Sequence, residues 1–148
     1  MRAAIAGARP ENADAGVRMA VNVLIVDDDD VDRERLLRML QRYPAPLHIT
    51  EASSKAGALA ALSEQGFDFV FLDFRLADGD GRELVPDIQA LTERHSLIVA
   101  ITGAGNEQAA VSAIKSGIHE YLPKYALSAQ RLHQAIDDGL RYLGVQEK

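Results

Sequence analysis

The stretch Phe69-Val70-Phe71-Leu72-Asp73, followed by Phe74-Arg75-Leu76-Ala77-Asp78-Gly79-Asp80-Gly81, decides the fold of this chain. Its four apolar residues are typical of a strand that is buried on both faces, as a central strand of a parallel sheet must be. Asp73 stands where that strand ends. Because the carboxyl ends of strands face the ligand crevice in open α/β sheets, Asp73 is a candidate site residue.

A second apolar strand, expected over 21–26, also ends in acid, because Asp27-Asp28-Asp29-Asp30 follows it directly. The alternation of strand and helix patterns predicts an α/β fold: a doubly wound five-stranded parallel sheet in the flavodoxin-like order 2-1-3-4-5. That order makes the first and third strands neighbours, so Asp27, Asp28 and Asp73 should cluster. The other three strands are expected at 47–52, 97–101 and 119–122.

Helices are predicted between these strands from apolar residues at helical spacing. Ser53 or Ser54 can cap the second helix, and Ser128 can cap the last one. Asp29, Asp30 and Asp32 are interpreted as solvated acids at the start of the first helix, where they favour the helix dipole. The expected helices include residues 35–40, 56–62, 84–91, 109–114 and 132–143.

Composition limits the classes of function that are open. The chain has 148 residues, of which 47% are hydrophobic and 26% charged, as expected for one soluble globular domain. The net charge of −6 disfavours direct nucleic-acid binding. No apolar run approaches the ~20 residues of a membrane helix. The absence of cysteine and of a secretory signal core fits a cytoplasmic protein. Met1 or Met19 could be the true start.

The predicted acid cluster favours a divalent cation, because adjacent carboxylates repel one another without one. Mg²⁺ prefers such oxygen ligands and keeps room for a phosphoryl oxygen, and Mn²⁺ is a possible substitute. An Asp beside the ion can act as a nucleophile and form an acyl phosphate. Thr102 and Lys124, at the ends of the fourth and fifth strands, could hold phosphoryl oxygens.

The ordered set of motifs resembles the receiver domain of two-component response regulators over about Val21 to Leu143. The residues that carry the resemblance are Val26-Asp27-Asp28, Asp73 after Val70-Phe71-Leu72, Ile101-Thr102-Gly103 and Tyr121-Leu122-Pro123-Lys124.

The resemblance implies that Asp73 accepts a phosphoryl group from a sensor histidine kinase or a phosphotransfer protein. It implies that Asp28 and Asp73 bind the metal directly, that Asp27 acts largely through water, and that the backbone carbonyl of Arg75 completes the set. It further implies that Thr102 and Lys124 contact the phosphoryl group and that Tyr121 changes rotamer as the switch.

Residues 1–20 are rich in Ala, Gly, Arg and Pro without periodicity, so we expect a flexible tail there and a single receiver domain over 21–145. Its output would be binding of an unknown downstream protein, or homodimer formation, through the face made by the fourth and fifth helices.

Two residues depart from the family pattern. Tyr125 stands where proline usually follows the lysine, and a cis bond there would cost about 3 kcal/mol, so we expect the loop to take a different path. Arg75 places a cation at the mouth of the site and should alter the phosphoryl lifetime.

Two alternatives remain open from the sequence. A haloacid dehalogenase type phosphatase would use the D-x-D spacing of Asp27 and Asp29, although little chain remains for a cap over the substrate. A receiver that has lost phosphorylation could survive as a docking module.

The four histidines, His48, His95, His119 and His133, lack metal-ligand spacing and are interpreted as surface or boundary residues.

Overall fold

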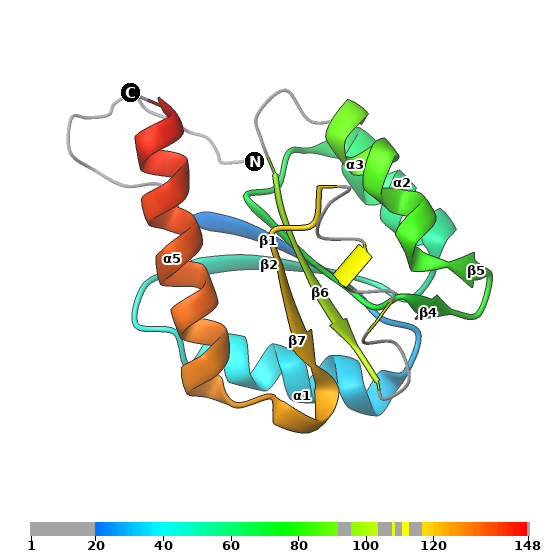
Figure 1. Cartoon of the computed structure of the whole chain (residues 1–148), viewed down its shortest axis with the longest axis horizontal. Helices are drawn as coiled ribbons and strands as arrows, with labels where there is room; N and C mark the ends of the chain where they lie inside the picture. Colours follow the sequence, from blue (N-terminus) through cyan, green and yellow to red (C-terminus); the bar gives the residue numbers. More distant parts are fainter. Residues whose placement is uncertain (1–19, 92–95, 104–107, 109–110, 113–116, 148) are drawn as a thin grey trace.

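The computed structural model describes residues 20–91, 96–103, 108, 111–112 and 117–147, and its centre is a five-stranded parallel sheet (Figure 1). The strand order β2-β1-β3-β6-β7 is the predicted order 2-1-3-4-5. The last strand begins one residue later than predicted. The strands are β1 (Val21–Val26), β2 (Leu47–Ala52), β3 (Phe69–Leu72), β6 (Leu97–Thr102) and β7 (Glu120–Pro123).

Each described α-helix that follows a strand begins where the sequence offers a capping side chain or a turn. Asp29 accepts a hydrogen bond from the Asp32 amide at 2.9 Å, and Ser54 accepts one from Gly57 at 2.9 Å. Ser128 caps the last helix. Of the helix expected over 109–114, only residues 111 and 112 are described, and both are helical. The described helices are α1 (Asp30–Gln41), α2 (Lys55–Glu64), α3 (Leu84–Leu91) and α5 (Ala129–Glu147), with 3-10 turns η1 (Gly81–Glu83) and η2 (Lys124–Ala126).

The helices cover both faces of the sheet: α1 and α5 lie on one side, α2 and α3 on the other (Figure 1). The alternation within β3 explains why, because Phe69 and Phe71 pack with α1 and α5 whereas Val70 and Leu72 pack with α2 and α3. All four side chains are buried. The central strand therefore carries core residues on both faces, as its unbroken apolar run predicts.

A short antiparallel hairpin, β4 (Arg75–Leu76) and β5 (Gly79–Asp80), follows Asp73 and was not predicted as strand. Asp80 caps η1, because its carboxylate accepts a hydrogen bond from the Arg82 amide at 2.9 Å. The hairpin thereby returns the chain to the sheet edge at which β3 ended.

The hairpin is tied to α2 by a group that we call the hairpin clamp, formed by Lys55, Asp78 and Glu83. The Asp78 carboxylate accepts hydrogen bonds from the amides of Lys55 at 2.9 Å and Ala56 at 3.2 Å. The Lys55 ammonium pairs with Glu83. The clamp therefore supplies partners for two amides in the first turn of α2 that the helix itself leaves open.

In the part of the chain that the structure describes, every helix is too short or too polar to cross a bilayer. Residues 1–19 lie outside the described part, so the division into a tail and a domain at residue 20 stays a prediction.

Candidate functional site

Two acids of the predicted cluster follow paired residues of neighbouring strands. Val26 of β1 and Leu72 of β3 are partners in the sheet, and the next residues are Asp27 and Asp73. The Asp73 amide donates to the Val26 carbonyl at 2.9 Å, which fixes the backbone of Asp73 against β1. Carboxylate oxygens of Asp27, Asp28 and Asp73 all lie within 4.8 Å of one another. The structure thus brings the three predicted acids together.

The three carboxylates differ in exposure. The side chains of Asp27 and Asp73 are only 5% and 6% exposed, whereas Asp28 is exposed at the rim. Burial raises the pKa of Asp27 to about 6, and the hydrogen bond from the Asp29 amide and the charge of Lys124 offset only part of that rise. The site therefore holds a carboxylate whose ionised form is costly without additional positive charge.

Lys124 supplies positive charge from the end of β7. Its Nζ lies 3.0 Å from Asp73 Oδ2, 3.1 Å from Asp27 Oδ2 and 2.7 Å from Asp32 Oδ2. Burial would lower the pKa of this ammonium, but the hydrogen bonds that it donates to Asp32 and Asp73 and the nearby negative charges outweigh burial, and its pKa is raised. Lys124 is consequently a charged donor at neutral pH.

Lys124 and the two residues after it form the 3-10 turn η2. The peptide bonds of the described residues are all trans. Tyr125 is 71% exposed and points away from the core. The residue that replaces the usual proline therefore does not keep the Lys124 ammonium from the acids.

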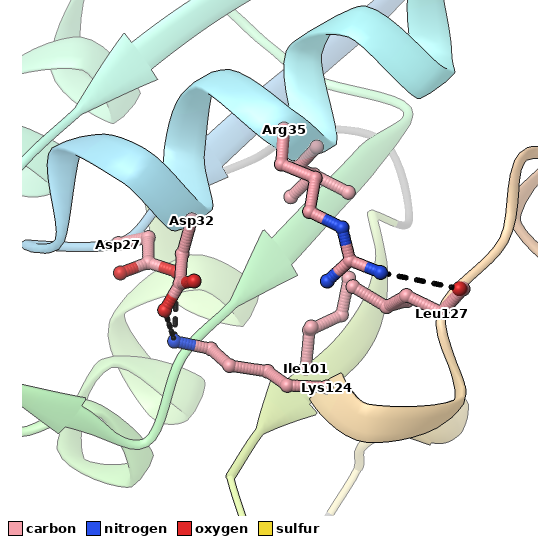
Figure 2. A pocket seen from close by; sticks show the side chains of 7 residues that line it. Asp27, Asp32, Arg35, Ile101, Lys124 and Leu127 are labelled. Carbon is pink, nitrogen blue, oxygen red and sulfur yellow. Dashed lines mark hydrogen bonds and ion pairs between the residues drawn. The ribbon is translucent and has the colours of Figure 1, made fainter.

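Asp32 is a site neighbour that sequence reasoning missed. It was interpreted as a solvated acid like Asp29 and Asp30, and that interpretation is wrong for Asp32, because its carboxylate bonds Lys124 (Figure 2). For Asp29 the interpretation is confirmed, because Asp29 is the N-cap of α1. The Asp32 contact joins residues 92 positions apart, and local spacing in the sequence carries no signal for it.

The remaining predicted site residues belong to β6, β7 and β4. Thr102 is fully buried at the end of β6 and pairs in register with Pro123, the residue before Lys124. Tyr121 is half-buried and packs against the core layer that includes α2 and α3. The Arg75 amide donates to Asp73 Oδ1 at 3.1 Å, and its side chain is exposed.

Gly81 is a second neighbour that the sequence analysis did not single out. A Cβ atom at this position would lie 2.1 Å from the Asp73 carbonyl oxygen, which is too close for any side chain. The Gly81 amide also donates to the Phe74 carbonyl at 2.7 Å. The close return of the chain to the backbone of Asp73 requires glycine here. In the sequence, the glycine itself, eight residues after Asp73, is the local signal of this close approach.

The donor set fits a magnesium ion. Mg²⁺ is bound by oxygen ligands at about 2.1 Å, so ligands on opposite sides of one ion lie roughly 4 Å apart. Carboxylate oxygens of Asp27, Asp28 and Asp73 that lie within 4.8 Å of one another match this requirement. The triad of acids is typical of the Mg²⁺ site of receiver domains.

The profile of the response regulator receiver domain matches residues 23–137, which include all of these side chains. The chain belongs to the response regulator receiver family. Over 107 residues it is 36% identical to the photosynthetic apparatus regulatory protein RegA of Rhodobacter capsulatus, covering 71% of this chain and 55% of RegA. Over 124 residues it is 28% identical to the sensory transduction protein LytT of Enterococcus faecalis, covering 84% of this chain and 50% of LytT. The chain thus spans about half the length of these relatives.

Solved structures agree with this family fold. A CheY-like receiver domain protein of Methanospirillum hungatei superposes with a TM-score of 0.77 at 21% identity, over 86% of this chain and 99% of that one. NtrX of Brucella abortus in complex with ADP superposes with a TM-score of 0.78 at 29% identity, over 87% of this chain and 29% of NtrX.

Receiver domains are phosphorylated by histidine kinases and are signalling modules rather than classical enzymes. Membership of the family therefore favours the receiver interpretation over the haloacid dehalogenase alternative.

Proposed function

We propose that this chain is a phosphorylation switch in which Asp73 accepts a phosphoryl group from a histidine kinase or a phosphotransfer protein. One observation carries the proposal: the buried Asp73 carboxylate lies beside the oxygens of Asp27 and Asp28 and 3.0 Å from the Lys124 ammonium. A nucleophile, an oxygen donor set for a cation and a separate positive charge therefore meet at one strand end.

Transfer would begin with an Asp73 carboxylate oxygen directed at the phosphorus of a phosphohistidine. A new O–P bond forms while the N–P bond breaks, and the histidine nitrogen keeps the electron pair. Lys124, whose Nζ lies 3.0 Å from Asp73 Oδ2, would pair with a phosphoryl oxygen. The backbone of Asp73 is held against β1 by its hydrogen bond to the Val26 carbonyl.

Asp28 and Asp73 would hold Mg²⁺ directly, with Asp27 acting through water and the Arg75 backbone carbonyl as a further ligand. Bound Mg²⁺, or Mn²⁺ in its place, supplies neutralisation of the charge on the acids and on the phosphoryl oxygens.

The output would be protein binding. In this proposal Thr102 bonds a phosphoryl oxygen, Tyr121 changes rotamer, and the face that includes β7 and α5 binds a downstream protein or a second copy. The net charge of −6 argues against direct binding of nucleic acid. We propose a cytoplasmic protein with a tail over 1–20 and one receiver domain over 21–145.

Arg75 should tune how long the phosphoryl group persists, because its exposed side chain lies two residues after Asp73. We expect Arg75→Ala to change the rate of autodephosphorylation, measured by loss of the phosphorylated mass with time. Equal rates in the wild type and the variant would contradict this role.

The proposed function is tested by the intact mass after incubation with acetyl phosphate and Mg²⁺. We expect a gain of one phosphoryl group in the wild type, and none in Asp73→Asn or in the presence of EDTA. Asp78→Asn is the matched control, since it removes an Asp from the neighbouring hairpin and should keep the label. If the wild type gains no mass, the docking-module alternative is favoured.

A further inference from the structure

The three N–H donors of the Lys124 ammonium face three carboxylates. Asp32 is the nearest at 2.7 Å, with Asp73 at 3.0 Å and Asp27 at 3.1 Å. An ammonium has three hydrogens, so the three carboxylates can occupy all of its donors. A phosphoryl oxygen that binds Lys124 must therefore replace at least one of these carboxylates.

The Asp32 carboxylate is available for this contact because another residue caps α1. Asp29 accepts the hydrogen bond from the Asp32 amide, and the Asp29 amide in turn donates to Asp27 Oδ1 at 2.9 Å. The Asp32 side chain is 37% exposed, compared with 5% for Asp27. It approaches the ammonium from α1, as Figure 2 shows.

The three carboxylates would have different roles once the metal and the phosphoryl group are bound, a distinction that rests on the proposed function. Asp73 would carry the phosphoryl group, and Asp27 would turn to the metal side of the site. Neither change involves Asp32, whose carboxylate lies 2.7 Å from the Lys124 ammonium. Its negative charge would then lie beside the incoming anion.

We propose that Asp32 is a positioning residue that holds Lys124 in the unphosphorylated state and competes with the phosphoryl group for the ammonium. Asp32 would thereby set how tightly the site binds an anionic phosphoryl donor and how strongly Lys124 pairs with the phosphoryl group.

The test measures the affinity for beryllofluoride, an analogue of the phosphoryl group, by isothermal titration calorimetry in Mg²⁺. We expect Asp32→Asn to bind about threefold to tenfold more tightly than the wild type, the effect of one partly exposed ion pair. Asp30→Asn is the matched control. It removes the same charge from the same helix turn, but Asp30 is 86% exposed and pairs with Arg33 instead of Lys124. Asp32→Glu should return the affinity towards the wild-type value.

A second measurement separates positioning from a merely structural role. Without Mg²⁺ and beryllofluoride, Asp32→Asn should melt at a lower temperature than Asp30→Asn, because Lys124 loses its nearest partner. The variant would then be less stable and yet bind the anion more tightly. A residue needed only for local structure would weaken binding as it lowers the melting temperature.

The proposal is overturned if Asp32→Asn binds beryllofluoride with the affinity of Asp30→Asn, or less tightly than the wild type. In that case the wild type would still gain its phosphoryl mass, and the proposed function would stand. If neither the wild type nor Asp32→Asn binds beryllofluoride or gains mass, the proposed function fails, and the inference about Asp32 fails with it.

Discussion

Two lysines of this chain are similarly exposed, yet the pKa of an acid beside one is raised and the pKa of an acid beside the other is lowered. The side chains of Lys124 and Lys55 are 20% and 22% exposed. Beside Lys124, burial raises the pKa of Asp27 to about 6. In the hairpin clamp, the amide of Lys55 and further hydrogen bonds lower the pKa of Asp78. The partner of Lys55, Glu83, is 65% exposed.

The difference shows that the surroundings of the acids, more than the lysine, decide what an ion pair does. Backbone amides at a helix start stabilise the charged form of Asp78 directly. Asp27 is buried with Asp73 nearby, and Lys124 offsets only part of the cost. Asp78 therefore stabilises the fold, whereas Asp27 retains an electrostatic cost that a cation can relieve.

Removing each lysine should give the largest contrast. We expect Lys124→Met to weaken beryllofluoride binding in Mg²⁺ by about 30- to 100-fold, because a charge-assisted hydrogen bond to the anion is lost. Lys55→Met should change this affinity less than about twofold. Calorimetric titration of both variants provides the measurement. Similar losses in the two variants would show that the clamp is part of the site.

The backbone at Gly81 passes close to the backbone of Asp73, so a methyl group at Gly81 should lower the stability of the fold. We expect Gly81→Ala to lower the free energy of unfolding by about 2 kcal/mol, because its Cβ would meet the Asp73 carbonyl oxygen at 2.1 Å. Gly66→Ala is the control, since a Cβ at Gly66 has nothing within 4 Å. Urea denaturation measures both, and equal stabilities would contradict the close approach.

The cost of the buried acid should appear as a dependence on pH. In EDTA at pH 7.5, we expect Asp27→Asn to be more stable than the wild type by about 1–2 kcal/mol. The folded pKa of about 6 exceeds the unfolded value of about 3.9, so wild-type stability falls as pH rises between them. The gain should therefore shrink at pH 4.5. A gain that is the same at both pH values, in urea denaturation, would argue against a raised pKa.

Replacing the acid of the hairpin clamp should change stability in the opposite direction from Asp27→Asn, and by less. We expect Asp78→Asn to be less stable than the wild type at pH 7.5, because the lowered pKa of Asp78 stabilises the fold above its unfolded pKa. That difference should be lost as pH falls below about 4, where the unfolded carboxyl is protonated. Thermal melting at both pH values tests it, and a variant as stable as the wild type at pH 7.5 would exclude a stabilising clamp.

The sheet and the central acids were predictable because their signals are local. The apolar run that ends at Asp73 and the acids after β1 each identify a buried strand with a polar end. Parallel topology then places Asp27, Asp28 and Asp73 together without knowledge of any side-chain contact. Lys124 could be assigned to the same edge for the same reason, because it follows β7 directly.

The contacts that were not predicted join distant parts of the chain. Asp32 meets Lys124 across 92 residues, and Asp78 meets the Lys55 amide across 23. Both acids occupy positions that local rules explain adequately as a helix start or a turn, so the sequence gives no reason to look for a remote partner. The hairpin of two-residue strands was missed because each strand is too short to show a period.

The exposed turn after Lys124 gives this protein a convenient place for an optical reporter. The chain contains no tryptophan, and Tyr125 is 71% exposed directly beside the site lysine. Tyr125→Trp would introduce a single indole without filling any core space. Its fluorescence would then report on the surroundings of the turn beside Lys124, free of emission from any other tryptophan.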